Sequence, residues 1–171
     1  MIWHDDFSTD LDNSKWVTAN YCDHAGGPVL HMSENVWTSN GNLVIRINNT
    51  QTDCPTPAPQ PSSWACGSCT AGKHYNYTTG WVENSSNFNI QYGYIEAQIK
   101  IPYGKALWPA FWTFIGNGVN GSNQAEIDIA EITGDLSYKS YLKYLPADQI
   151  STTNIHLRYC DENSYDWDGN K

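Results

Sequence analysis

Residues 125–132 read AEIDIAEI, in which small and apolar residues separate Glu126, Asp128 and Glu131. Because successive side chains of a β-strand point to opposite faces, this run predicts a strand with Glu126 and Asp128 on one face. Strict alternation would turn Glu131 towards the apolar face, at a cost of roughly several kcal/mol. One extra residue, a β-bulge, returns Glu131 to the side of its partners. We therefore predict a bulged strand that carries three acids on one face.

Acids held this close resist ionising together, so one of them tends to keep its proton. A protonated acid beside an ionised carboxylate is the pair that cleaves glycosidic bonds. A solvated acidic face and a cation site are the alternatives that the acids alone leave open. Four aromatic residues precede the strand, namely Trp108, Phe111, Trp112 and Phe114. Aromatic rings beside paired carboxylates suit a sugar ring, so they favour the enzymatic interpretation.

The length of 171 residues indicates one domain, residues 1–171, that is large enough to bury a core. Thirteen glycines, eight prolines, eight tryptophans and eleven tyrosines suit an all-β domain with many turns. The net charge is −9, which argues against nucleic acid and against an anionic membrane as partners, because both would repel the protein. A neutral polysaccharide is the partner that this charge favours, and we expect a monomer.

The sequence favours secretion. No run approaches the ~20 apolar residues of a membrane span, and no signal peptide precedes Trp3 in this sequence. The cysteines are Cys22, Cys54, Cys66, Cys69 and Cys160. Together with a low lysine content, they favour an extracellular protein with some disulfides. Cys54 could pair with Cys66 or with Cys69, and the sequence leaves the connectivity open.

Other segments carry strand signals. Residues 39–47 (SNGNLVIRI) hold Asn-Gly, the strongest short hairpin signal, beside alternating residues. Residues 92–101 (YGYIEAQIKI) alternate cleanly and place Gln98 on the polar face. Alternation over residues 107–115 places Trp108 and Trp112 together, where core packing and sugar stacking are equally good interpretations. Strands are also expected at residues 2–7, 78–83, 86–90 and 155–159, and loops at residues 21–34 and 50–72.

Several of these motifs together resemble glycoside hydrolase family 16. The chain has EIDIAE at residues 126–131 and WPAFW at residues 108–112. The segments WHDDF (3–7), LDNSKW (11–16), SNGNLVIRI (39–47) and YGYIEAQIKIP (92–102) follow in the family's order. This resemblance extends from Trp3 to about His156, and the bulged spacing is similar to that of the laminarinase-like branch.

The resemblance implies a fold and a set of catalytic residues. The fold would be all-β, an antiparallel β-sandwich of the jelly-roll, concanavalin-like type with a concave sheet. Glu126 would be the nucleophile and Glu131 the acid/base, with Asp128 between them. Retaining hydrolysis within a β-linked polysaccharide would follow from these roles.

The resemblance also implies substrate-binding residues. Trp108 and Trp112 would stack on sugar, and His156 would face the cleft. Gln98 stands where the family usually has an arginine, so the usual sugar contact differs here. No cofactor is required, although members often hold a structural calcium ion near the N-terminal strand, where Asp5 and Asp6 lie.

The domain of this family continues with several further strands beyond the point at which this sequence stops. We therefore expect a chain that is incomplete at its C-terminus. Without those strands, one wall of the cleft and both sheets would lack members, and we expect less than full activity from these 171 residues alone.

The predicted function is endo-acting hydrolysis of β-1,3-glucan of the laminarin type. Family members with the unbulged spacing cut mixed-linkage glucans, and the nine lysines and arginines make a sulfated galactan a poorer choice. A lectin-like sandwich that binds carbohydrate without turnover is the alternative from another class. A transglycosylase, which shares the glycosyl-enzyme, is the second alternative.

Overall fold

The computed structural model describes residues 3–18, 20–22, 29–54, 72–84, 88–102, 104, 107–115, 123–132 and 151–159. Over these residues the regular structure is β-strand, apart from one 3-10 helix, η2 (Ser33–Asn35). This confirms the all-β prediction. The described residues contain no helix with the length and apolar character of a membrane span. The chain divides into two compact units, Met1–Gly93 and Tyr94–Lys171.

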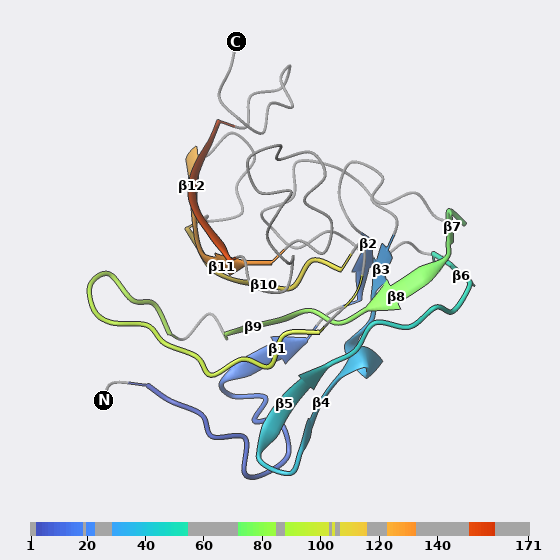
Figure 1. Cartoon of the computed structure of the whole chain (residues 1–171), viewed down its shortest axis with the longest axis horizontal. Helices are drawn as coiled ribbons and strands as arrows, with labels where there is room; N and C mark the ends of the chain where they lie inside the picture. Colours follow the sequence, from blue (N-terminus) through green and yellow to red (C-terminus); the bar gives the residue numbers. More distant parts are fainter. Residues whose placement is uncertain are drawn as a thin grey trace. The chain divides into compact units, whose positions relative to one another are not determined.

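The first unit contains nine short strands among its described residues (Figure 1). They are β1 (Trp16–Thr18), β2 (Tyr21–Cys22), β3 (Val29–His31), β4 (Val36–Ser39), β5 (Asn42–Ile45), β6 (Thr52–Asp53), β7 (His74–Tyr75), β8 (Tyr77–Thr79) and β9 (Val82–Asn84). The pairs β1–β9, β2–β3, β4–β5 and β6–β7 are antiparallel, whereas β3–β8 is parallel. The parallel pair is an exception to the antiparallel prediction.

The hairpin β4–β5 confirms the turn predicted within residues 39–47. Ser39 pairs with Asn42, and the two residues between them are Asn40 and Gly41. Their φ angles are 51° and 70°, which only glycine and asparagine adopt readily. The Asn-Gly sequence therefore sets the register of this hairpin.

The core of the first unit lies around Leu30, Cys54 and Tyr75, with Met32 packed against them. Asn35, at the end of η2, is fully buried beside β8. Its side-chain amide donates hydrogen bonds to Thr78 Oγ1 (3.1 Å) and to the Thr79 carbonyl (3.2 Å). The buried amide is satisfied in this way and ties η2 to β8.

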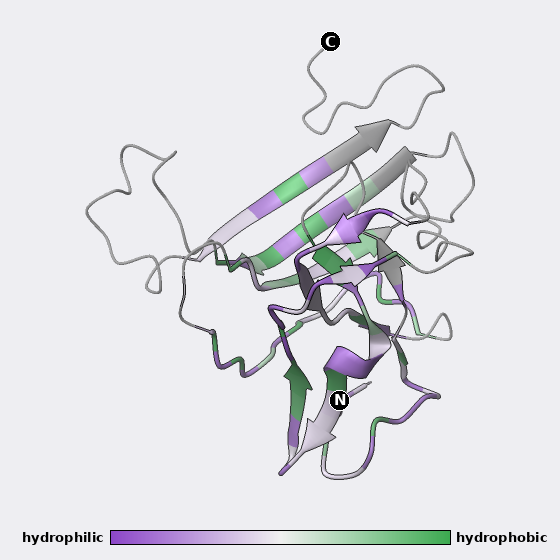
Figure 2. Ribbon diagram, turned by 90° about the vertical axis from the view of Figure 1, so that its right-hand side faces the viewer, coloured by the Kyte–Doolittle hydropathy of each residue, from purple (hydrophilic) through white to green (hydrophobic). Residues whose placement is uncertain are grey.

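The second unit contains the sheet β10 (Ala110–Ile115), β11 (Asn123–Glu131) and β12 (Thr152–Tyr159), in the order β10-β11-β12. Both pairs are antiparallel. Hydrophilic and hydrophobic residues alternate along the two long strands of this sheet, β11 and β12 (Figure 2). The strands predicted at residues 107–115 and 155–159 are confirmed in type, each with a shifted N-terminal boundary.

Strand β11 contains the predicted bulge. Against β12, Asp128 pairs with Asn154 and Glu131 pairs with Thr152. Three steps along β11 therefore match two steps along β12, so β11 holds one extra residue between Asp128 and Glu131. The pairing with β10 shifts at the same place, between Phe111 and Trp112.

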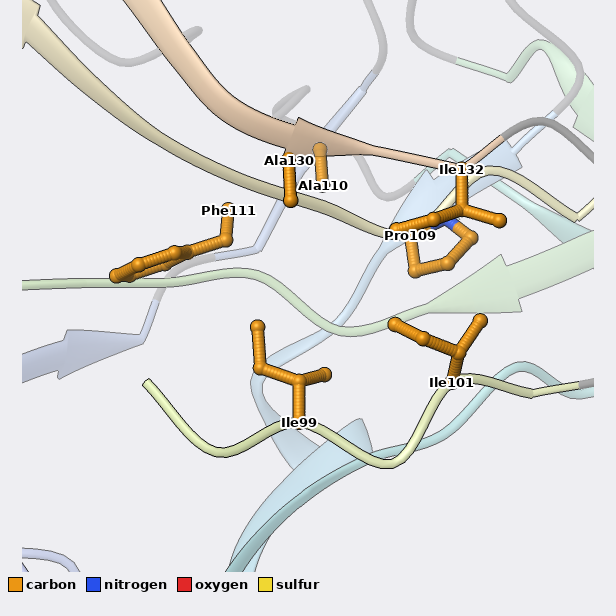
Figure 3. Close-up of a pocket in the computed structure, with 7 residues that line it drawn as sticks. All are labelled: Ile99, Ile101, Pro109, Ala110, Phe111, Ala130 and Ile132. Carbon is orange, nitrogen blue, oxygen red and sulfur yellow. The ribbon is translucent and has the colours of Figure 1, made fainter. Parts of the chain in front are cut away.

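Residues 92–101 differ from their prediction, because they form no strand in the described structure. Ile99 and Ile101 instead face Pro109, Phe111 and Ile132 across a shallow apolar pocket (Figure 3). The alternating pattern separates two sets of side chains, but a strand also needs a hydrogen-bonded neighbour. That neighbour is absent from the part of the chain that the structure describes.

Five smaller predictions also differ. The described parts of the strands expected at 2–7 and 86–90 form no strand, and the strand expected at 78–83 is split into β8 and β9. The loop expected at 21–34 contains β2 and β3, and the loop expected at 50–72 contains β6. In the first segment, Asp5 Oδ1 accepts a hydrogen bond from the Phe7 amide (2.9 Å) and Asp5 Oδ2 accepts one from Trp16 Nε1 (2.9 Å). Such side-chain bonds compete with a strand ladder. Cys66, Cys69 and Cys160 lie outside the described residues.

Candidate active site

Glu126 and Asp128 lie on one face of the central strand β11. Phe114 of β10 and His156 of β12 stand opposite Glu126. Trp112 of β10 stands opposite Asp128. Directly opposed residues share a face, so all five side chains belong to the same side of this sheet. Glu126 and Asp128 therefore share a face, as alternation predicted, and Trp112 lies on that face too.

Both acids are buried, with 9% of Glu126 and 3% of Asp128 exposed. A carboxylate this far from water needs a partner. His156 Nε2 lies 3.1 Å from Asp128 Oδ2. One ligand atom each of Glu126, Asp128 and His156 lies within 4.8 Å of the others. The structure therefore joins His156, named from sequence, to the two acids.

The bulge places Glu131 on this same face. Glu131 stands opposite Ala110 of β10, in the row that continues through Trp112 and Phe114. The indole N–H of Trp108 donates a hydrogen bond to Glu131 Oε1 over 2.9 Å. The next residue, Ile132, is buried and faces the apolar pocket. Glu131 is therefore turned away from the apolar side, as predicted.

The opposite face of the sheet departs from expectation. Ile127 is 46% exposed, and Ile155, which stands opposite Ile127 on β12, is 69% exposed. Alternation predicted that this face would be the buried one. In the part of the chain that the structure describes, the acidic face is the more buried of the two, because aromatic side chains of β10 share it.

The aromatic residues of β10 flank the acids. The rings of Trp112 and Phe114 meet edge to face, with centroids 5.9 Å apart. Trp112 is half-buried, whereas 65% of Trp108 is exposed. An exposed indole that holds a carboxylate by its N–H leaves a ring face for a ligand.

Gln98 is not brought to the acids by any hydrogen bond among the described residues. Its side chain lies in the exposed segment 94–102. Sequence reasoning overlooked Asn154, which stands opposite Asp128 on β12. The available signal was its spacing: Asn154 precedes His156 by two residues, so both lie on one face of a strand.

The arrangement offers two buried carboxylates, an imidazole and a third carboxylate held by a tryptophan. These groups can supply a nucleophile and a proton donor on one side of a sheet, as acid/base catalysis requires. The same donor atoms could hold a cation, since carboxylate oxygen and imidazole nitrogen both bind metals.

Comparison with known proteins gives a family for this chain. The model of the family "Glycosyl hydrolases family 16" matches residues 32–162. An endo-1,3-1,4-beta-glycanase of Rhizobium meliloti (strain 1021) is 35% identical over 79 residues, which are 46% of this chain and 16% of that protein.

The solved structures that are similar over 97% of this chain include two β-1,3-glucanases. The catalytic domain of an endo-1,3-beta-glucanase (laminarinase) from Thermotoga petrophila RKU-1 is 24% identical, with a TM-score of 0.59, and 64% of it is covered. The endo-beta-1,3-glucanase of Pyrococcus furiosus is 21% identical, with a TM-score of 0.54, and 62% of it is covered. The likeness confirms the fold class, a jelly-roll β-sandwich. The chain spans less than two thirds of the length of these relatives.

Proposed function

Because the chain belongs to the glycosyl hydrolases of family 16, we propose that it cleaves a β-linked polysaccharide internally and with retention of configuration. The first proposed substrate is β-1,3-glucan of the laminarin type. The observation that carries the proposal is the bulge of β11, which puts Glu131 on the face of Glu126 and Asp128. A retaining mechanism needs two acids close together, one as the nucleophile and one as the proton donor.

In the proposed mechanism Glu126 attacks the anomeric carbon, while Glu131 gives its proton to the glycosidic oxygen. The carbon–oxygen bond breaks, and a covalent glycosyl-enzyme forms on Glu126. Glu131, now ionised, takes a proton from water, whose oxygen attacks the anomeric carbon and releases Glu126. Two inversions at one carbon give retention.

Asp128 and His156 would position the nucleophile. Asp128 lies between the two glutamates in sequence, and its Oδ2 is 3.1 Å from His156 Nε2. Asp128 shares a face of β11 with Glu126, and the imidazole beside its carboxyl group would help to restrain both acids. Burial of Glu126 and Asp128 keeps water from weakening these interactions.

Trp108 would act on the proton donor and on the sugar at once. Its N–H holds Glu131 Oε1, which fixes the carboxyl rotamer, and its exposed ring face is available for a pyranose. Trp112, opposite Asp128, would add a second apolar surface. Stacking of sugar on indole rings uses their rigid, flat area.

The preference for β-1,3-glucan is supported by the bulged spacing and by the names of the similar structures. The relative from Rhizobium meliloti is named for 1,3-1,4 linkages, so a mixed-linkage glucan is the substrate to compare. Sulfated galactans are less favoured, because the exposed Gln98 supplies no charge and the net charge is −9.

The test is product sizing with the full-length protein on laminarin, on mixed-linkage β-glucan and on a sulfated galactan. Release of short oligosaccharides from laminarin, lost in Glu126→Gln, is expected. Binding of laminarin without release of oligosaccharides would support the lectin-like alternative. Products longer than the supplied substrate would support a transglycosylase. Near-normal turnover by Glu126→Gln would refute the assigned nucleophile.

An extracellular location and a monomeric state are part of the proposal, since a polymer outside the cell is the substrate and no partner is needed for the site described. Light scattering during size-exclusion chromatography should give the mass of one chain. A stable dimer would contradict the monomer.

A further inference from the structure

Three side chains of the second unit, Glu126, Asp128 and His156, also converge in the manner of metal ligands. Glu126 and His156 are direct cross-strand neighbours, and Asp128 lies two residues along β11. One ligand atom of each lies within 4.8 Å of the other two. Two of the three residues are at least nine-tenths buried, namely Glu126 at 9% exposed and Asp128 at 3%.

An independent observation concerns one oxygen of Asp128. Its Oδ2 is buried and accepts no hydrogen bond from any described residue. His156 Nε2 is near, at 3.1 Å, but the contact lacks the alignment of a hydrogen bond. A buried carboxylate oxygen that accepts no hydrogen bond is costly. A cation between the imidazole and the two carboxylates would satisfy this oxygen.

The chemistry of the three ligand atoms favours one kind of metal ion. Two carboxylate oxygens and one imidazole nitrogen match the ligands of Zn²⁺, which binds them at about 2.0–2.2 Å and takes water as a fourth ligand. Tetrahedral ligands at that distance lie roughly 3.3–3.5 Å apart, which small rotations of these side chains can reach. Ca²⁺ needs six to eight oxygen ligands, roughly, and disfavours nitrogen.

We propose that Glu126, Asp128 and His156 form a Zn²⁺ site, and that Zn²⁺ and polysaccharide exclude one another there. The bound metal would use the lone pairs with which Glu126 attacks sugar, so zinc would be a reversible inhibitor. The binding itself rests on the three side chains and not on the proposed function, because it can be measured without turnover.

The experiment is isothermal titration of the metal-free full-length protein with Zn²⁺ and, separately, with Ca²⁺. His156→Gln removes one ligand, and His74→Gln is the matched control. His74 Nδ1 also contacts a carboxylate oxygen, that of Asp53, at 2.8 Å. This pair is exposed, and the structure shows no third ligand beside it among the described residues.

We expect one Zn²⁺ per chain at these residues, at least tenfold weaker binding in His156→Gln, unchanged binding in His74→Gln and no comparable binding of Ca²⁺. Visible absorption of the Co²⁺-substituted wild-type protein provides a second reading that does not depend on the folding of a variant. Intense bands would indicate four-coordinate ligation. Equal Zn²⁺ affinity in wild type and His156→Gln, or weak six-coordinate bands with Co²⁺, would overturn the proposal.

Discussion

Trp108 donates its indole N–H to Oε1 of Glu131 over 2.9 Å, while 65% of the tryptophan stays exposed. The two residues lie 23 positions apart, and the bulge in β11 makes their meeting possible by turning Glu131 towards the row of β10 that ends in Ala110. The side chain of Trp108 thus restrains Glu131, the proposed proton donor, and presents a flat ring surface beside it.

Trp108→Phe keeps an aromatic ring and removes the indole N–H that donates the hydrogen bond to Glu131. Because Glu131 acts as a proton donor in the proposed mechanism, the bond is of the neutral kind, which contributes about 0.5–1.5 kcal/mol. The value of kcat/KM on laminarin should therefore fall by roughly two- to tenfold. Trp37→Phe, in the β4–β5 hairpin beside Arg46, is the control and should keep its activity. Full activity in Trp108→Phe would show that the bond does not orient the proton donor.

Asn35→Ala should destabilise the protein by about 2–3 kcal/mol, because it leaves buried partners without hydrogen bonds. Thr78 Oγ1 and the Thr79 carbonyl lose a donor, and Asn48 Nδ2 loses the acceptor that it holds at 2.8 Å. Urea denaturation gives the change in unfolding free energy. Asn42→Ala, at an exposed asparagine of β5, should lose much less. Equal losses in both variants would contradict the importance of burial.

Gly80→Ala should cost about 1–3 kcal/mol of unfolding free energy through overpacking. A Cβ at this position would lie 2.6 Å from Val36 Cγ2 and 2.7 Å from the Asn35 carbonyl oxygen. The backbone oxygen cannot move without breaking nearby pairing. Ser39→Ala, at the exposed end of β4, is the control. A melting temperature unchanged by Gly80→Ala would mean that the neighbouring strands yield easily.

Burial raises the pKa of Glu83 above its ordinary value of 4.5, and the neighbouring Trp81 offsets part of the rise. The stability that the protonated form contributes is present below pH 4.5 and is lost as pH rises through the folded-state pKa. Glu83→Gln should therefore melt at a higher temperature than wild type at neutral pH, and the difference should vanish in acid. Glu34→Gln, at an exposed site, should show no such dependence. A constant difference at all pH values would refute a role for ionisation.

The sequence predicted the acidic strand well, because each signal in it was local. Alternation assigned the faces of Glu126 and Asp128, and the cost of a charge among apolar side chains predicted the bulge before Glu131. Asn-Gly at residues 40–41 likewise defined a hairpin through its own backbone preferences.

The features that the sequence did not predict depend on partners that are distant in the chain. Residues 92–101 have an alternating pattern but no neighbouring strand in the described part of the chain. The exposure of Ile127 and Ile155 was also unforeseen, since periodicity separates two faces without showing what covers each. The contact between the side chains of His156 and Asp128 could not be predicted without the register of β11 against β12.

The measurement that tests the central claim most directly is mass spectrometry of the protein after reaction with a 2-deoxy-2-fluoro glycoside of laminaribiose. Such a reagent slows hydrolysis of the glycosyl-enzyme, so the sugar remains on the nucleophile. The label should lie on the peptide that contains Glu126, and Glu126→Gln should take up none. A label on Glu131 or on another strand, or a product of inverted configuration from the unmodified enzyme, would contradict the account.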